Sequence, residues 1–146
     1  MTRRVFFCFH REDFWRAGQV INCWVSSGGE EAGFIDDAGW EALRKQGDEA
    51  VKRWINSKLE GTSATVVLIG AETSSIEWVR YEIRRSHEKG NGLLGIYINN
   101  LKDQNGNRGR QGDDHFGPIA KACTGNDVYF WQLYPTYDWV NDNGDH

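Results

Sequence analysis

Continuous apolar runs alternate with helix-spaced apolar stripes along most of this chain. A run of consecutive apolar residues rich in β-branched and aromatic side chains is typical of a strand buried on both faces. The run TVVLIG at 65–70 has this composition most clearly. The predicted strands span residues 3–9, 32–37, 65–70, 93–98 and 127–134.

The segments between these runs have apolar residues three and four positions apart, as on one face of a helix. Phe14, Ala17, Ile21 and Trp24 form the first such stripe. Ser74 and Glu77 have the spacing of a capping box that would start a later helix. The other predicted helical segments are a brief turn at Trp40 and Leu43, a helix capped by Asp48 that runs to Leu59, the helix from Ser74 toward Gly90, and a short docking helix over 136–140.

Strands that alternate with helices predict an α/β fold, a parallel sheet covered by helices on both faces. Residues 99–117 are polar and glycine-rich and are predicted to be a loop. The chain has no internal repeat and no linker-like stretch, so residues 1–146 are predicted to form one domain. Ligands of such sheets bind beyond the carboxyl ends of the strands. The predicted rim therefore consists of the loops HRED (10–13), DDAGW (36–40) and AETSS (71–75).

Composition narrows the function classes. The chain has 146 residues, 39% hydrophobic and 26% charged, as in an ordinary soluble globular protein. Its net charge of −4 argues against a nucleic-acid partner. No apolar run is long enough for a membrane span or a signal peptide. The three cysteines, Cys8, Cys23 and Cys123, form no CxxC pair, so we expect reduced thiols and a cytoplasmic location.

The standard phosphate-binding motifs are missing from the predicted rim. The first strand is not followed by GxGxxG, and no GxxxxGK[ST] occurs anywhere in the chain. This argues against an ordinary dinucleotide dehydrogenase and against a P-loop enzyme. A phosphate group can still bind the exposed amides at a helix N-terminus near 10–13, with Arg11 close by.

The position of Glu82 raises the sharpest functional question. With about 100° per residue, Val79, Ile83 and Ser86 fall on one buried stripe, and Glu82 lies roughly 60° to its side. Trp78 precedes Glu82 by one turn on the same flank. A solvent-exposed flank would make Glu82 a boundary ion pair, for example with Arg85. A flank that lines a pocket would make Glu82 a functional carboxylate among aromatic rings.

Other constellations carry weaker signals. Cys8 and His10 share a strand face, as a thiol nucleophile and its base would, but a buried and inert thiol is the preferred interpretation. Two groups contain metal-ligand residue types, His10 with Glu12 and Asp13, and 113–115. Neither group has the spacing of a known metal motif, and the C-terminal NDNGDH lacks a twelve-residue calcium loop. We therefore predict no metal site.

Four segments together resemble one known family. They are RRVFFCFHREDFW, TVVLIGAETSSIEWVRYEI, GNGLLGIYINNLKD and YPTYDWVNDNG. The chain resembles the TIR-like domains of the bacterial Thoeris anti-phage system over nearly its whole length. The most specific part is Trp78–Glu82–Ile83, which is similar to the motif that carries the catalytic glutamate of NAD-consuming TIR enzymes. Two features differ from the family: Cys8 stands where many TIR sequences have a hydroxyl residue, and the region between the fourth predicted strand and YDWV is shorter than in some relatives.

The resemblance implies a flavodoxin-like, five-stranded parallel sheet in the order 2-1-3-4-5. It also implies cleavage of NAD at the nicotinamide–ribose bond, with cyclisation of the product to a cyclic ADP-ribose signal that reaches an effector protein. NAD would be the substrate, with no separate cofactor. Self-association on activation and a phage trigger protein are further implied partners. The implied site consists of Glu82 as the catalytic residue and Phe9, His10, Asp13, Asp36, Trp40 and Trp78 as substrate-binding residues.

Two alternatives stay open at this point. Many TIR domains are non-catalytic modules that act by self-association or by binding a trigger protein. A phosphoryl-accepting receiver domain would use Asp36 or Asp37, although these acids follow the second predicted strand and no aspartate ends the third. Nicotinamide release from NAD separates the enzyme from both.

Overall fold

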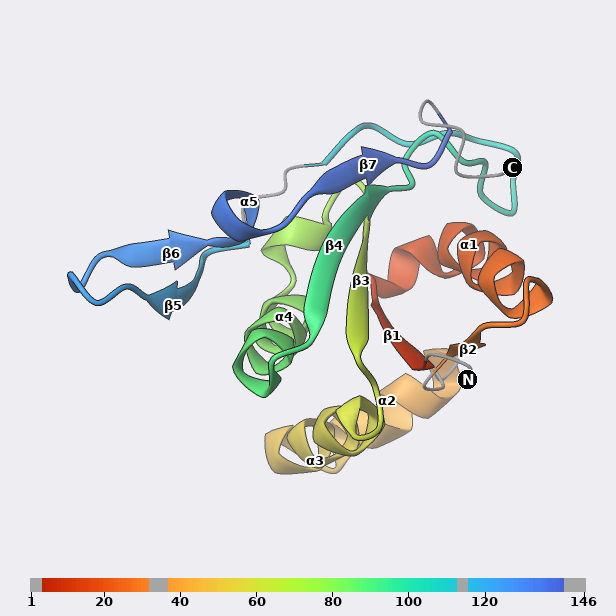
Figure 1. Ribbon diagram of the computed structural model, residues 1–146. Helices are drawn as coiled ribbons and strands as arrows, with labels where there is room; N and C mark the ends of the chain where they lie inside the picture. Colours follow the sequence, from red (N-terminus) through yellow and green to blue (C-terminus); the bar gives the residue numbers. More distant parts are fainter. Residues whose placement is uncertain (1–3, 32–36, 113–115, 141–146) are drawn as a thin grey trace.

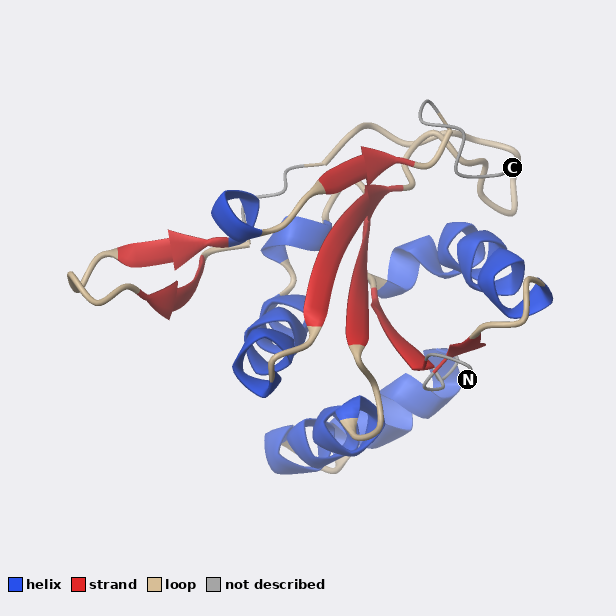
Figure 2. Ribbon diagram, in the orientation of Figure 1, coloured by secondary structure: helices blue, strands red, loops and turns tan. Residues whose placement is uncertain are grey.

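The computed structural model describes residues 4–31, 37–112 and 116–140, in which strands and helices alternate along the chain (Figures 1 and 2). Short 3₁₀ turns at Arg11–Asp13 and Thr73–Ser75 follow β1 and β3. No helix in these ranges is long and apolar enough to cross a membrane. The strands and helices are β1 (Arg4–Cys8), α1 (Phe14–Ser26), β2 (Glu30–Glu31), α2 (Asp37–Lys45), α3 (Asp48–Leu59), β3 (Ala64–Ile69), α4 (Glu77–Lys89), β4 (Gly92–Tyr97), β5 (Pro118–Lys121), β6 (Asp127–Tyr129), α5 (Phe130–Leu133) and β7 (Thr136–Asp138).

The main sheet has the strand order β2-β1-β3-β4-β7, and each neighbouring pair is parallel. Val5 of β1 lies opposite Ala64 of β3, and Ala64 lies opposite Gly92 of β4. A second, two-stranded antiparallel sheet of β5 and β6 projects away from this body (Figure 1). The predicted α/β class with a parallel sheet is confirmed.

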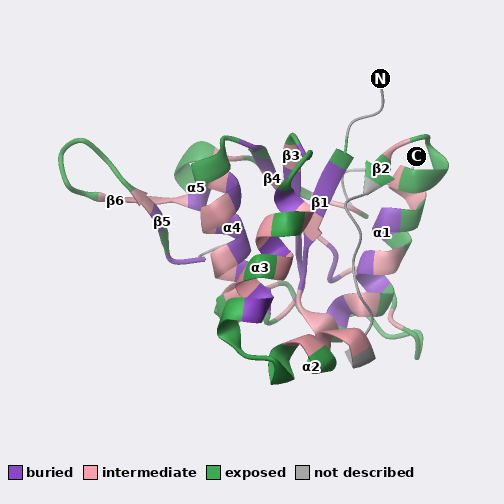
Figure 3. Ribbon diagram, turned by 90° about the horizontal axis from the view of Figure 1, so that it is seen from below, coloured by how far each residue is buried: buried purple, intermediate pink, exposed green. Residues whose placement is uncertain are grey.

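Helices pack on both faces of the sheet, because successive strand residues point to opposite sides. Phe6 and Cys8 belong to a cluster with apolar residues of α3 and α4, whereas Val5 belongs to a cluster with apolar residues of α1. The buried residues accordingly concentrate on the strands and on the sheet-facing sides of these helices (Figure 3). The sheet-facing residues of the helices include Ala17, Val20 and Ile21 of α1, Val51 and Ile55 of α3, and Val79 and Ile83 of α4.

The two edges of the sheet differ from the sequence prediction. At one edge, β2 is Glu30–Glu31, residues 32–36 lie outside the described ranges, and Asp37 is already helical. At the other edge, the predicted strand 127–134 is divided between β6 and α5, and neither part joins the parallel sheet. The strand beside β4 is β7, where a short helix was predicted.

Phe130 and Pro135 explain why β7, and not residues 127–134, forms the edge of the sheet beside β4. Phe130 is fully buried and Trp131 and Leu133 are exposed, which fits one helical turn docked on the core better than a strand buried on both faces. Pro135 has no backbone N–H, but its carbonyl accepts a 2.9 Å hydrogen bond from the Gly95 amide. Parallel pairing with β4 therefore begins at Pro135 and continues into β7.

Two predicted helix caps are wrong in detail. The N-cap of α4 is Ile76, with no side-chain hydrogen bond, so Ser74 and Glu77 form no capping box. The N-cap of α3 is Gly47, so Asp48 is the first helical residue. Gly90 does end α4 in the left-handed conformation, with a φ of 92°, as its place after the last helical residue predicted.

Candidate active site

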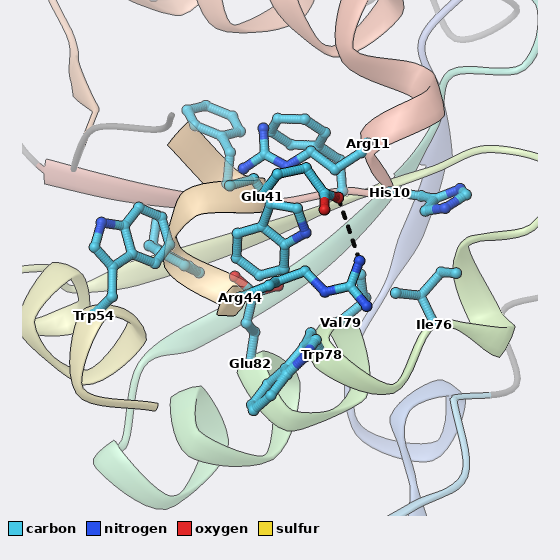
Figure 4. A pocket seen from close by; sticks show the side chains of 13 residues that line it. His10, Arg11, Glu41, Arg44, Trp54, Ile76, Trp78, Val79 and Glu82 are labelled. Atoms are coloured by element: carbon cyan, nitrogen blue, oxygen red, sulfur yellow. Dashed lines mark hydrogen bonds and ion pairs between the residues drawn. The ribbon is translucent and has the colours of Figure 1, made fainter. Parts of the chain in front are cut away.

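A pocket of about 360 Å³ lies beside the carboxyl end of β1. Its walls come from β1 and the loop after it, from α2 and α3, and from the start of α4 (Figure 4). Two of the three predicted rim loops, 10–13 and 36–40, contribute residues to the pocket. The third loop, 71–75, contributes none, but Ile76 directly after it lines the pocket. The lining residues are Phe6, Phe7, Phe9, His10, Arg11, Trp40, Glu41, Arg44, Trp54, Ile76, Trp78, Val79 and Glu82.

Glu82 is a buried carboxylate at the wall of this pocket. The residue is only 8% exposed, and the helical phase of α4 places it beside buried Val79 and Ile83. Within the described ranges its carboxylate has no ion pair and no hydrogen bond. Arg85 instead binds Asn56 at 3.0 Å and Glu88 at 2.7 Å, so the boundary ion pair considered above is not formed.

Burial dominates the protonation of Glu82. Desolvation raises the pKa of its carboxyl group to about 8, and the positive charge of Arg11 lowers that pKa only in part. A carboxyl group whose pKa lies near neutrality, in a cavity and without a structural partner, is a typical candidate for a functional site.

Cys8 does not have the properties of a nucleophile. The residue is fully buried in the cluster under α3 and α4. Burial raises the pKa of its thiol well above the usual value, and the nearby Glu82 raises this pKa further. The thiol therefore stays protonated, which supports the interpretation of Cys8 as an inert core residue.

Two arginines line the pocket in addition to the predicted site residues: Arg11, which the sequence placed near a possible phosphate, and Arg44, which it did not indicate. The Arg11 guanidinium lies 5.2 Å from the ring centre of Phe9 and 5.1 Å from that of Trp40, within the range of cation–π attraction. Arg44 follows Trp40 by one turn of α2 and is 3.3 Å from Glu41. The i, i+4 spacing of Trp40 and Arg44 was the available signal, because it puts both side chains on one helix face.

The structure brings together five of the seven predicted site residues. Phe9, His10, Trp40, Trp78 and Glu82 all line the pocket. The Trp78 ring also packs edge-on against Tyr81, with ring centres 5.5 Å apart. Asp36 lies outside the described residues.

Asp13 lies away from the pocket lining and has a structural role. It is 2% exposed, and one carboxylate oxygen accepts a 2.9 Å hydrogen bond from Arg16. Arg16 also donates to the carbonyls of Leu101 and Asn107, at 2.8 and 3.0 Å, so the pair fastens the loop after β4 to the start of α1. A Cβ at Gly70 would collide with the Asp13 carboxylate, which explains why the end of β3 needs glycine there.

His10, Glu12 and Asp13 have ligand-type atoms within 4.8 Å of one another. Arg16 neutralises Asp13, however, and half-exposed Glu12 lies 3.4 Å from His10. The second acidic group, 113–115, lies outside the described ranges.

Comparison of the sequence with known proteins identifies one family, and its family model covers the residues that line the pocket. The family model for the TIR-like domain of the Thoeris protein ThsB matches residues 6–103, a span that includes every lining residue. A protein of Bacillus cereus (strain MSX-D12) named "Putative cyclic ADP-D-ribose synthase ThsB1" is 46% identical over 183 aligned residues. The alignment covers 99% of this chain and 95% of the relative.

Proposed function

The chain belongs to the Thoeris ThsB TIR-like family, and on this premise we propose that it is an enzyme that cleaves NAD at the nicotinamide–ribose bond. We propose further that it cyclises the remaining ADP-ribose part into a signal for an effector protein in anti-phage defence. The observation that carries the proposal is Glu82, a buried carboxylate at the wall of an aromatic pocket, with no hydrogen bond or ion pair among the described residues. The name of the Bacillus cereus relative supports the same chemistry.

The reaction needs one well-placed negative charge. When the bond between ribose C1′ and nicotinamide breaks, its electron pair goes to the pyridinium nitrogen and nicotinamide leaves as a neutral molecule. No general acid is required, and positive charge develops on the ribose, as in glycoside cleavage. An ionised Glu82 that accepts hydrogen bonds from ribose hydroxyls stabilises this charge. A group of the adenosine half, or water, then bonds to C1′ and releases one proton.

The remaining lining residues fit the rest of the substrate. Phe9, Trp40 and Trp78 offer aromatic faces to the nicotinamide ring, whose positive charge favours such contacts. Arg11 and Arg44 are the cations that the lining offers to the diphosphate. His10 forms part of the wall next to Arg11. Asp13 does not contact the substrate; its role is indirect, because it binds Arg16, which holds the loop after β4.

Release of nicotinamide from NAD by the purified protein tests the proposal directly. A non-catalytic adaptor, which binds a trigger protein or itself, releases none under any condition. The assay is therefore run with the protein alone, at high protein concentration, and with lysate of phage-infected cells as a source of a trigger protein. Failure to release nicotinamide in all three arms would favour the adaptor.

Activity is expected to rise with protein concentration. Trp131 and Leu133 of α5 and Tyr137 of β7 expose 49–53% of their surface, and such apolar side chains are suited to self-association. Nicotinamide release per protein molecule, measured across a hundredfold dilution beside light scattering, checks this expectation. Constant specific activity in a sample that stays monomeric throughout would contradict it.

Substitution of Trp78 by phenylalanine is expected to weaken NAD turnover more than it weakens the fold. Trp78 is only partly buried and borders the pocket, so the smaller ring removes stacking surface and leaves the core in place. We expect KM to rise about tenfold, the range of one lost stacking contact, and the melting temperature to drop by only a few degrees. A clear loss of melting temperature with normal kinetics would instead make Trp78 a structural residue.

A further inference from the structure

A second hollow adjoins the pocket across a shared wall. It has a volume of about 280 Å³ and is more open to solvent than the pocket. Three of its lining residues, Glu41, Arg44 and Trp78, also line the pocket, so the two spaces border the same side chains of α2 and the start of α4. The residues that line only the second hollow are Lys45, Asp48 and Val51.

The pocket alone is small for a dinucleotide. Its volume of about 360 Å³ is near the lower end of the range for sites that enclose one drug-sized ligand. NAD has two nucleosides joined by a diphosphate, and the proposed chemistry fixes its nicotinamide ribose at Glu82. The adenosine half must then extend past the rim, and the second hollow begins at that rim.

We propose that the second hollow binds the adenosine half of NAD, with the diphosphate crossing the shared wall at Arg44. This inference rests on the proposed function. Lys45 and Arg44 supply positive charge on the phosphate side, and the Asp48 carboxylate can accept hydrogen bonds from ribose hydroxyls or from the adenine amino group. The Trp78 indole forms an apolar wall for the adenine ring.

The ion pair between Arg44 and Glu41 leaves Arg44 available for this role. The two side chains are 55% and 58% exposed and 3.3 Å apart, so their attraction is screened by water. A diphosphate brings a larger negative charge and geometry that suits a guanidinium. Arg44 can therefore exchange a weak surface partner for the substrate.

The arrangement also favours cyclisation. With both halves of NAD held on either side of Trp78, the adenosine half stays close to the ribose carbon that loses nicotinamide. Attack within one bound molecule then competes well with attack by water, because the reacting groups are already positioned. A protein that loses the second hollow would release more linear ADP-ribose and less cyclic product.

The test compares two ligands in calorimetric titrations of the full-length protein. ADP-ribose contains the adenosine half, and nicotinamide mononucleotide lacks it. Lys45→Glu reverses a charge that lines only the second hollow, and Arg53→Glu is the matched control, because Arg53 is exposed on α3 and lines neither space. For Lys45→Glu we expect affinity for ADP-ribose to fall about tenfold at physiological salt, with affinity for nicotinamide mononucleotide changed less than twofold.

The control variant is expected to bind both ligands as the wild type does. Equal losses for the two ligands, no loss for either, or no binding of ADP-ribose to the wild type would each overturn the inference. These titrations need no turnover, so their outcome is separate from that of the nicotinamide-release assay. A wild type that releases nicotinamide while Lys45→Glu binds ADP-ribose normally would leave the proposed function intact and remove only the adenosine site.

Discussion

Glu82→Gln is expected to abolish NAD cleavage and to leave the fold intact. The change keeps the size and shape of a side chain that has no protein partner within the described ranges, so packing of α4 on the sheet is preserved. It removes the only negative charge proposed to face the ribose as positive charge develops there. Loss of one preorganised electrostatic contact of this kind lowers kcat by about 100- to 1000-fold.

Nicotinamide release under saturating NAD measures this effect, and circular dichroism checks that the variant is folded. Glu77→Gln is the matched control, because Glu77 is an exposed residue of the same helix and lines neither space. The control should retain full activity. Turnover by Glu82→Gln at the wild-type rate would mean that the buried carboxylate has no part in the reaction.

The stability of the wild-type protein is expected to fall as the pH rises from about 4.5 to about 8, through the titration of Glu82. In this window the folded protein keeps the proton on Glu82, whereas the unfolded chain releases it, so rising pH favours unfolding. The stabilisation is fully present below the unfolded pKa and is lost once the pH passes the folded pKa. The shift corresponds to roughly 3–5 kcal/mol of free energy of unfolding.

Urea unfolding of the wild type and of Glu82→Gln at pH 5, 7 and 9 isolates this contribution. All other titrating groups are common to the two proteins, so the difference between their free energies of unfolding reports Glu82 alone. We expect the glutamine variant to gain stability relative to the wild type as the pH rises. A difference that stays constant over this range would show that Glu82 ionises normally in the folded protein.

The same titration predicts a pH dependence of activity. The proposed reaction needs ionised Glu82, so kcat/KM for nicotinamide release should rise with pH until about 8, the pKa in the free protein. The positive nicotinamide ring of bound NAD favours the ionised carboxylate, so kcat should reach its plateau at a lower pH. Bound NAD thus adds its positive charge to that of Arg11 in stabilising the ionised Glu82.

The central strands could be predicted from the sequence because their apolar composition requires burial on both faces of the sheet. The runs 3–9, 65–70 and 93–98 agree with β1, β3 and β4 to within one residue. Each is apolar on both faces, and such a segment must be covered on both sides. The stripes of α1, α3 and α4 were equally clear, because a helix packed on a sheet needs one continuous apolar face.

The edge elements could not be predicted in the same way. β7 pairs with β4 on one side alone, and β2 is two residues long, so neither needs a strongly apolar sequence. The aromatic run before Pro135 had the composition of a buried strand, yet its pairing partner was β5 and its buried Phe130 fitted a helical turn. Pairing at an edge depends on which distant segment is available, and local periodicity contains no record of that.

The candidate site, like the fold, could be predicted from the sequence only in part. The helical phase of α4 placed Glu82 and Trp78 on one flank, and the family motif pointed to the same two residues, so the sequence by itself determined where to look. Only the tertiary structure decided that this flank faces a cavity, because α2 and the loop after β1 close over it from elsewhere in the chain. It also decided that Arg11 and Arg44 enter the cavity while Asp13 turns to Arg16. Periodicity reports which face of an element is buried, and the residues opposite that face are chosen by contacts distant in sequence.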